Sequence, residues 1–334
     1  MALVAGVRDL RRLPKAELHL HLTGAMRPET LRELARGQGF EPPDPGGVAD
    51  WPGFVQVWRA AHLVCKGEPR NLDRLVRETV ADAAADGVSW LQPEFSPHSH
   101  GGPETWDAVL ELVLAAGLDE AGRRDIGFGL TLGVPRHKGP DMAAELIRMA
   151  VRHADEGVVA VGLGGDETAF PGSVFAPAFA AARDAGLTIA PHAGEMSGPE
   201  SVREALDHLG ATRLAHGVRA VEDPRLVELL AARGITLDVA VSSNLGLGYY
   251  RRLDEHPLPA LLDAGVRCSL NSDDPLMFGS LLGEYELARS GLGFSDERLA
   301  DLARTSFETS DAPAGLVADA VAGIGSWLTA SERS

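Results

Sequence analysis

The sequence predicts an α/β fold, a (β/α)8 TIM barrel with a helical insertion after the first strand, and three observations support this class. Short apolar runs alternate with longer segments of helical periodicity about eight times along the 334 residues. A glycine separates several of these helices from the strand that follows. No Gly-x-Gly-x-x-Gly motif follows the first strand, which disfavours a doubly wound sheet, the competing α/β architecture.

Eight short runs are expected to be strands, because they are apolar and rich in β-branched residues. The first of them alternates His and Leu with a period of two from His19 to Leu22, which is typical of a strand. In chain order the expected strands cover residues 16–22, 88–95, 126–133, 158–164, 187–192, 212–216, 235–240 and 266–271.

The segments between these runs are rich in Ala, Leu, Glu and Arg and are expected to be helices. They cover residues 72–85, 106–121, 142–154, 176–185, 201–209, 224–233 and 259–264, and one more helix with a polar tail is expected within 310–334. Gly87, Gly186, Gly234 and Gly265 each stand just before a strand, where glycine suits the left-handed conformation that ends a helix. This repeat of strand, helix and glycine is the pattern of a barrel.

Residues 37–70 do not fit the repeat. They begin with a stretch rich in Pro and Gly and continue into an amphipathic helix expected over 54–65. An insertion at this point of a barrel lies over the carboxyl ends of the strands, so we expect a lid or a pocket wall, the alternative being one extra packed helix. Because the sequence has no internal repeat or low-complexity tract, residues 1–334 are expected to form a single domain.

Composition excludes several classes of protein. Hydrophobic residues make up 45% of the chain and charged residues 24%, which is typical of a globular protein and argues against disorder. The 48 acidic and 31 basic residues give a net charge of −17, which disfavours binding to nucleic acids and to anionic membranes. Cys65 and Cys268 suggest neither a disulfide framework nor a thiolate metal cluster.

The N-terminal stretch lacks the order of charged and apolar segments found in a secretory signal. No run approaches the roughly 18 uncharged apolar residues that a membrane span needs. We therefore expect a soluble, cytoplasmic protein whose partner is a small molecule, while the oligomeric state stays open.

Four of the eleven histidines differ from the rest because each lies on a predicted strand or at its carboxyl end: His19, His21, His192 and His216. His19 and His21 are two residues apart on one strand, so both imidazoles project from the same face. Two imidazoles inside a barrel are costly unless a partner satisfies them, and a divalent metal ion can satisfy both. Active sites of this fold are built at the carboxyl ends of the strands.

Three acids follow the same strand ends. Glu195 lies three residues after His192, and Asp273 and Asp274 follow the eighth strand. Taken singly, Glu195 suits a solvated loop, and Asp273-Asp274-Pro275 suits a turn before a helix. That all of these residues should meet at one rim without a role is improbable.

The donor set indicates a metal centre. Three imidazoles and one carboxylate with one open position are the ligands of a catalytic zinc site, and iron or manganese is the alternative. The fourth strand ends in Gly164-Gly165-Asp166-Glu167 without a lysine, which favours one Zn²⁺ per chain over a pair bridged by a carboxylated lysine. The remaining His and acids suit attack by an activated water on an electrophilic carbon, whereas no Gly-x-Ser-x-Gly elbow supports a serine nucleophile.

Four motifs stand out together: 14–22 (PKAELHLHL), 192–195 (HAGE), 216–217 (HG) and 269–275 (SLNSDDP). As a set they resemble the adenosine deaminase family of metal-dependent hydrolases. Their order and spacing agree with the family, and they span most of the chain. The resemblance implies a single Zn²⁺ ion held by His19, His21, His192 and Asp273.

The resemblance also implies the chemistry. His216 and Asp274 would orient and deprotonate the water that attacks C6 of a purine, and Glu195 would protonate N1 of the ring. The backbone N–H of Gly165 would contact N3, and Asp274 would also reach N7. Ammonia would leave as the adduct collapses.

Three departures from the family concern the substrate rather than the chemistry. Thr23 stands where nucleoside deaminases of the family usually carry an acid that binds the ribose 5′-hydroxyl, so a charge-assisted contact is lost. The second strand ends in Gln92-Pro93-Glu94-Phe95 rather than near an arginine, and no cysteine follows the seventh strand. We expect adenosine or 2′-deoxyadenosine as the substrate. Adenine, or a modified nucleoside such as aminodeoxyfutalosine, is the alternative.

Two further functions stay open at this point. The same barrel and metal site could hydrolyse an ester, a lactam or an amide, although Glu195 aimed at a ring nitrogen suits an aminopurine better. A non-catalytic nucleoside-binding barrel is the other alternative, and it is disfavoured because no expected catalytic position is substituted.

Overall fold

The computed structural model describes residues 8–330, and within them every paired strand is parallel to its neighbours. The strands are β1 (Lys15–Glu17), β2 (Val88–Leu91), β3 (Glu94–Phe95), β4 (Gly127–Phe128), β5 (Leu130–Pro135), β6 (Val158–Gly164), β7 (Thr188–Ile189), β8 (His192–Ala193), β9 (Arg213–His216), β10 (Thr236–Val239) and β11 (Arg267–Leu270).

Short interruptions divide three of the eight predicted strands. Pro93 separates β2 from β3, Gly129 separates β4 from β5, and Pro191 separates β7 from β8. Proline has no N–H to donate to a ladder, so it interrupts strand pairing at Pro93 and Pro191. The first strand is shorter than predicted, because regular pairing ends at Glu17 and continues only as isolated bridges.

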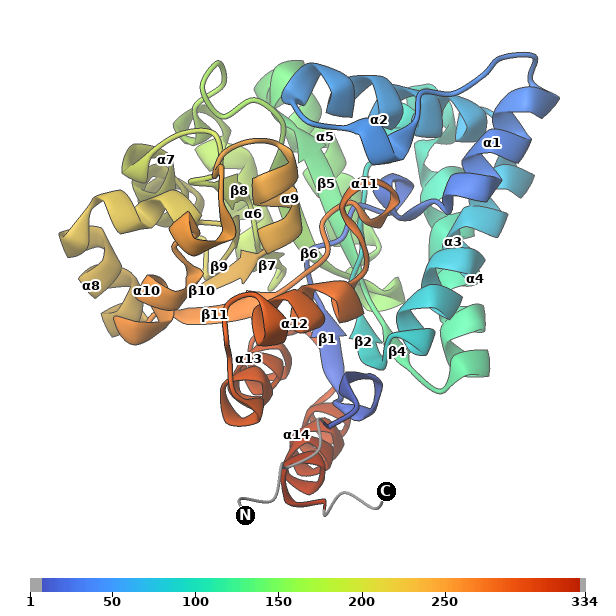
Figure 1. Ribbon diagram of the computed structural model, residues 1–334. Helices are drawn as coiled ribbons and strands as arrows, with labels where there is room; N and C mark the ends of the chain where they lie inside the picture. Colours follow the sequence, from blue (N-terminus) through green and yellow to red (C-terminus); the bar gives the residue numbers. More distant parts are fainter. Residues whose placement is uncertain (1–7, 331–334) are drawn as a thin grey trace.

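These bridges connect the sheets. Three sheets have the orders β1-β2-β4, β3-β5-β6-β7 and β11-β10-β9-β8. Beyond β1, Leu20 pairs with Asp273 at the end of the last strand, and His21 pairs with Glu94 of β3. The first strand therefore contacts both of its neighbours around the ring, and the predicted (β/α)8 barrel is confirmed (Figure 1).

Helices follow the strands around the barrel. They are α1 (Pro28–Gly37), α2 (Trp51–Cys65), α3 (Pro69–Ala85), α4 (Trp106–Arg124), α5 (Gly139–Arg152), α6 (Ala176–Asp184), α7 (Pro199–Glu204), α8 (Pro224–Arg233), α9 (Val241–Gly246), α10 (Leu258–Asp263), α11 (Pro275–Phe278), α12 (Leu281–Ser290), α13 (Asp296–Glu308) and α14 (Ala314–Thr329).

Each predicted helix is present, and its ends lie within three residues of the prediction except in two cases. The helix expected over 201–209 is α7 followed by a π-helical turn, Ala205–Leu209. The helix expected within 310–334 is α14, and the end of its predicted polar tail, 331–334, lies outside the described residues. The four glycines predicted to end helices have φ between 65° and 84°, so their left-handed conformation is confirmed.

Helix α1 occupies residues 28–37, ahead of the predicted insertion, and α2 lies within it. Helix α2 contacts the 3-10 helix Thr23–Ala25, and Phe54 of α2 stacks at 6.3 Å between ring centroids on Phe278 of α11. Both contacts follow the carboxyl ends of the first and last strands, which places α2 at this end of the barrel. Its role as a lid or pocket wall stays a prediction.

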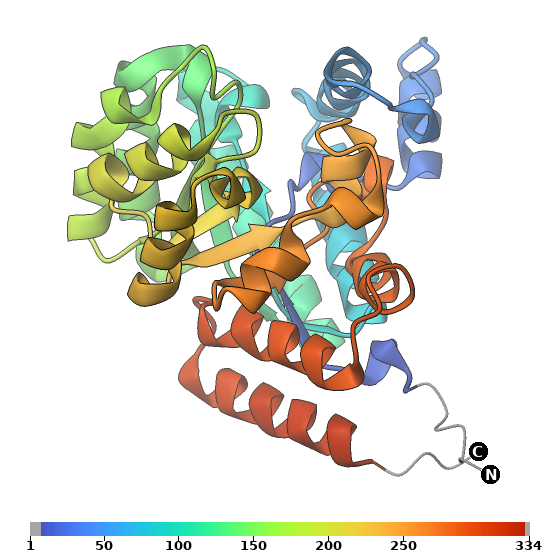
Figure 2. The same ribbon diagram turned by 60° about the vertical axis from the view of Figure 1, so that its left-hand side comes forward.

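At the opposite end, α13 packs against β1 and β11, and α14 packs on α13 (Figures 1 and 2). Helix α13 buries Leu299, Leu302 and Phe307. Helix α13 therefore covers the first and last strands of the ring and joins α14 to the barrel. Among the described residues, no helix is both long and apolar enough to cross a membrane.

Candidate active site

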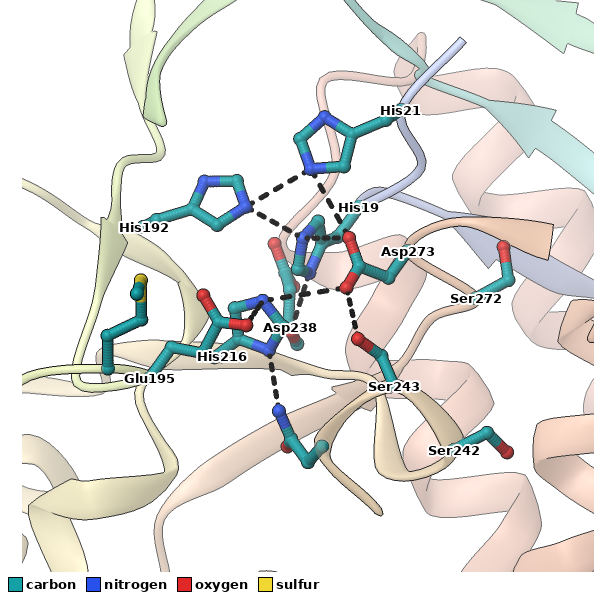
Figure 3. A network of polar contacts seen from close by, with 12 residues as sticks. His19, His21, His192, Glu195, His216, Asp238, Ser242, Ser243, Ser272 and Asp273 are labelled. Atoms are coloured by element: carbon teal, nitrogen blue, oxygen red, sulfur yellow. Dashed lines mark hydrogen bonds and ion pairs between the residues drawn. The ribbon is translucent and has the colours of Figure 1, made fainter. Parts of the chain in front are cut away.

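Three imidazoles and one carboxylate converge at the carboxyl end of the barrel, as Figure 3 shows. His19 and His21 lie just beyond β1, His192 begins β8, and Asp273 lies beyond β11. The Nε2 atoms of His19 and His21 each lie 3.2 Å from Nε2 of His192. Oδ1 of Asp273 lies 3.3 Å from Nε2 of His19 and 3.2 Å from Nε2 of His21. Residues more than 250 positions apart thus meet around one point.

The tautomer of His19 and the neutral form of His192 both suit a cation at that point. Nδ1 of His19 lies 3.0 Å from the carbonyl oxygen of Asp238, so Nδ1 carries the proton and Nε2 presents its lone pair to the cluster. Burial lowers the pKa of His192 well below its ordinary value, which keeps this imidazole neutral. Nitrogen ligands of a tetrahedral zinc ion lie about 3.3 Å from one another. The donor set therefore fits a metal ion in both chemistry and spacing.

Backbone strain accompanies the cluster. Asp273 has a φ of 61° and His216 a φ of 63°, in the left-handed region that residues with side chains rarely adopt. Such conformations cost about 1 kcal/mol or more and persist where surrounding contacts enforce them. Oδ2 of Asp273 accepts a hydrogen bond of 2.6 Å from the hydroxyl of Ser243, which is one of these contacts.

Glu195 and His216 form a second pair beside the first four residues. Nε2 of His216 lies 3.4 Å from Oε1 of Glu195 and 3.7 Å from Oδ2 of Asp273. Burial raises the pKa of Glu195 well above its ordinary value, and the charge of Asp273 adds to this effect. This shift favours the protonated form of the Glu195 carboxyl group.

The loop that carries Glu195 is held by another acid. The carboxylate of Glu167 accepts hydrogen bonds from the backbone N–H groups of Gly194 and Glu195, at 2.8 and 3.1 Å, and from the hydroxyl of Ser201. These contacts involve the backbone of Glu195 and not its side chain. The carboxyl group therefore stays available to a ligand.

Asp274 does not make the contact that a simple helix cap would make. It precedes α11, but its side chain forms no capping hydrogen bond, and Oδ1 is buried without a partner among the described residues. Burial, followed by the charge of Asp273, raises the pKa of Asp274 above its ordinary value. A Cβ atom on Gly24 would lie 1.7 Å from Oδ1 of Asp274, so only glycine leaves room for this carboxyl group.

The two residues expected to contact only the substrate are less defined. Thr23 is buried in the 3-10 helix Thr23–Ala25, and its hydroxyl has no hydrogen bond among the described residues. Gly165 follows β6 with a φ of 103° and is exposed. Their contacts with a substrate stay a prediction.

Sequence patterns gave no role to several residues that support the cluster. Ser243 and Asn244 lie on α9 and contact Asp273 and His216 respectively. His256 is buried and contacts Asn244. A Ser-Asn pair after a strand carries no signal of its own, because its partners come from other strands.

Glu94 is the most unexpected neighbour. Oε1 of Glu94 lies 3.7 Å from Nδ1 of His21. The paired glycines Gly133 and Gly162 on β5 and β6 leave space for this carboxylate, because a Cβ atom on either would lie 2.5 or 2.2 Å from its oxygens. Two paired glycines on neighbouring strands indicate space inside the barrel that a side chain from a third strand can fill.

Glu284 of α12 holds α9 in place. Its carboxylate accepts hydrogen bonds of 2.9 Å from the backbone N–H groups of Val241 and Ser242, at the start of the helix that carries Ser243 and Asn244. Burial raises the pKa of Glu284 to about 7, although these hydrogen bonds oppose the shift.

This pKa predicts how stability changes with pH. Between about pH 4.5 and pH 7 the folded chain keeps a proton on Glu284 that the unfolded chain has lost, so the free energy of unfolding falls as the pH rises. The contribution of this residue is about 3 kcal/mol. Urea denaturation should show that the free energy of unfolding falls less between pH 5 and pH 8 in Glu284→Gln than in the wild type. Glu286→Gln, an exposed change on the same helix, should behave as the wild type. Equal losses in all three proteins would contradict the assignment.

Comparison with known proteins agrees with this geometry. Residues 14–322 match the profile of the family described as adenosine deaminase. The chain is 44% identical to a putative adenosine/adenine deaminase of Streptomyces virginiae, over 96% of this chain and 98% of that protein. It is 34% identical to an aminodeoxyfutalosine deaminase of Acidothermus cellulolyticus, over 86% and 85% of the two chains.

A solved structure agrees as well. The crystal structure of adenine deaminase from Arthrobacter aurescens superposes with a TM-score of 0.87 at 29% identity, covering 95% of this chain and 99% of that one. The match of the family over most of the chain and the barrel architecture support the same assignment. The chain belongs to the adenosine deaminase family and is a hydrolytic deaminase that acts on a carbon–nitrogen bond.

Proposed function

We propose that this protein deaminates a 6-aminopurine hydrolytically, with one Zn²⁺ ion held by His19, His21, His192 and Asp273. The observation that carries the proposal is the convergence of three Nε2 atoms and Oδ1 of Asp273, which make four contacts of 3.2–3.3 Å and all lie within 4.8 Å of one another. Three nitrogen ligands and one oxygen ligand favour zinc among the divalent metals. When bound, the ion would supply Lewis-acid activation of a water molecule and a positive charge that favours the ionised form of Asp274.

The residues of the chain supply the proton transfers. Glu195, whose pKa is raised by burial, donates its proton to N1 of the purine, which makes C6 more electrophilic. His216 and Asp274 together orient the attacking water and manage its proton. The backbone N–H of the exposed Gly165 is available to N3. Asp274, once it has taken up the proton of the water, can donate a hydrogen bond to N7. The amino group leaves as ammonia.

We propose adenosine or 2′-deoxyadenosine as the substrate. The relatives reported above are named for adenosine, adenine and aminodeoxyfutalosine, so a 6-aminopurine ring is the feature that these names share. A free base is the second candidate, and one observation favours it. Thr23 offers a neutral hydroxyl where a carboxylate would bind the ribose, so the sugar gains less from binding.

A substrate panel tests the proposal. Zinc-loaded protein should release ammonia from at least one of adenosine, 2′-deoxyadenosine, adenine and aminodeoxyfutalosine, and kcat/KM ranks the four. We expect the two nucleosides to rank first. A higher kcat/KM for adenine would identify the free base as the substrate instead. No ammonia from any 6-aminopurine, at one zinc per chain, would overturn the proposal.

A further inference from the structure

We propose that Leu258, His256 and Asn244 form a directed chain of hydrogen bonds that fixes the proton of His216 on Nε2. His216 then acts as a hydrogen-bond donor, and Asp274 is the group that accepts the proton of the attacking water. The inference rests on the proposed function, because it divides the activation of water between these two residues.

The chain begins at a group that can only donate. Leu258 is the first residue of α10, and the N–H groups at the start of a helix have no partner within the helix. Its N–H donates to Nδ1 of His256 at 3.2 Å, and both residues are buried. Nδ1 of His256 must therefore present a lone pair, and the ring proton lies on Nε2.

The second link sets the orientation of an amide. Nε2 of His256, which carries the proton, lies 3.2 Å from Oδ1 of Asn244. The rotated amide would bring an N–H group against this N–H group and leave two buried donors facing each other, which costs about 1–3 kcal/mol. The amide therefore keeps its oxygen toward His256.

The third link fixes the tautomer of the catalytic imidazole. Nδ2 of Asn244 lies 3.1 Å from Nδ1 of His216, and an amide nitrogen donates only. Nδ1 of His216 is then an acceptor, and its single proton lies on Nε2. His216, Asn244 and His256 are each at most 4% exposed, so water does not compete for these contacts.

This tautomer changes what His216 can do. Its Nε2–H group faces Glu195, at 3.4 Å, and Asp273, at 3.7 Å. A nitrogen that already carries a proton cannot accept one from water, but it can donate a hydrogen bond to the oxygen that adds to C6. Asp274 offers a buried Oδ1 without a partner among the described residues, which is the acceptor the step needs.

With these roles, every proton of the deamination step has a donor and an acceptor. The water oxygen bonds to C6 while one of its protons passes to Asp274, and His216 keeps its own proton. Asp274 then gives that proton to the amino nitrogen, and the C6–N bond breaks to release ammonia. The remaining hydroxyl proton restores Glu195, which had protonated N1.

Long-range proton–nitrogen NMR of the zinc-loaded protein, with ¹⁵N-labelled histidine, reads the tautomer without any substrate. We expect the proton of His216 on Nε2. The variant Asn244→Asp has nearly the same shape but can only accept, so it should move this proton to Nδ1. Zinc content and KM should stay at their wild-type values while kcat falls about 10²-fold, because the donor is lost.

A pair of variants at His256 provides the matched control. His256→Gln keeps an N–H group that can face Asn244 and should preserve the Nε2 tautomer. His256→Leu removes it, frees the amide to rotate and should produce both tautomers of His216. If Asn244→Asp fails to fold, these two variants still test whether His256 fixes the tautomer of His216.

Two results would overturn the inference: a wild-type spectrum with the proton of His216 on Nδ1, or an Asn244→Asp protein in which the proton does not move. Both leave the deamination itself untouched. The converse outcome, an Nε2 proton in a protein that releases no ammonia from any aminopurine, would reject the proposed function alone.

Discussion

Replacing Glu195 with Gln should lower kcat by at least about 10³-fold, within the range that general acid catalysis contributes, while zinc content and KM change little. The amide is the size of the carboxyl group but does not transfer a proton at neutral pH. The loop should keep its conformation, because Glu167 holds the backbone N–H groups of Gly194 and Glu195 rather than the side chain. Ammonia release from the best substrate of the panel and metal analysis of the same preparation measure the two quantities.

Glu228→Gln is the matched control for this variant. Glu228 is exposed on α8, so the same change of charge there should leave kcat at the wild-type value. A fully active Glu195→Gln protein would show that Glu195 is not the proton donor. A loss of zinc together with activity would show instead that Glu195 supports the metal centre.

Replacing His192 with Ala should weaken zinc binding by more than about 100-fold, because loss of an outer-sphere partner alone costs about 10- to 100-fold in affinity. The Nε2 atom of His192 lies 3.2 Å from the Nε2 atoms of both His19 and His21, so it is a direct member of the cluster. The fold should survive, because the backbone carbonyl of His192 still accepts the 2.6 Å hydrogen bond from Arg136. Competition with a chromophoric chelator gives the affinity, and circular dichroism verifies folding.

The control here is His208→Ala, which removes an exposed imidazole at the end of the π-helical turn and should keep one tightly bound zinc per chain. Tight zinc in the folded His192→Ala protein would remove His192 from the proposed ligand set. Because deamination is assigned to the metal centre, this variant should also lose ammonia release with every aminopurine, unlike a variant that affects only sugar binding.

Helices and strands could be predicted well because their sequence patterns lie within short segments of the chain. Strand β6 and helix α8 have the predicted bounds, since an apolar run and a helical period are visible within a dozen residues. Regular pairing of the first strand ends at Glu17, although the alternation continues to Leu22. The reason is that Leu20 and His21 make single bridges to two different neighbours instead of a regular ladder.

The barrel class and the residue types that follow its strands could be predicted, since both depend on neighbours along the chain. Which side chains meet could not, because it depends on how distant segments pack. Three hydrogen bonds link Leu258, His256, Asn244 and His216, which come from different helices, strands and loops. The carboxylate of Glu94 likewise packs against two glycines of other strands. Such contacts depend on strand register and on packing across the barrel, where a shift of one residue would point each side chain to the other face.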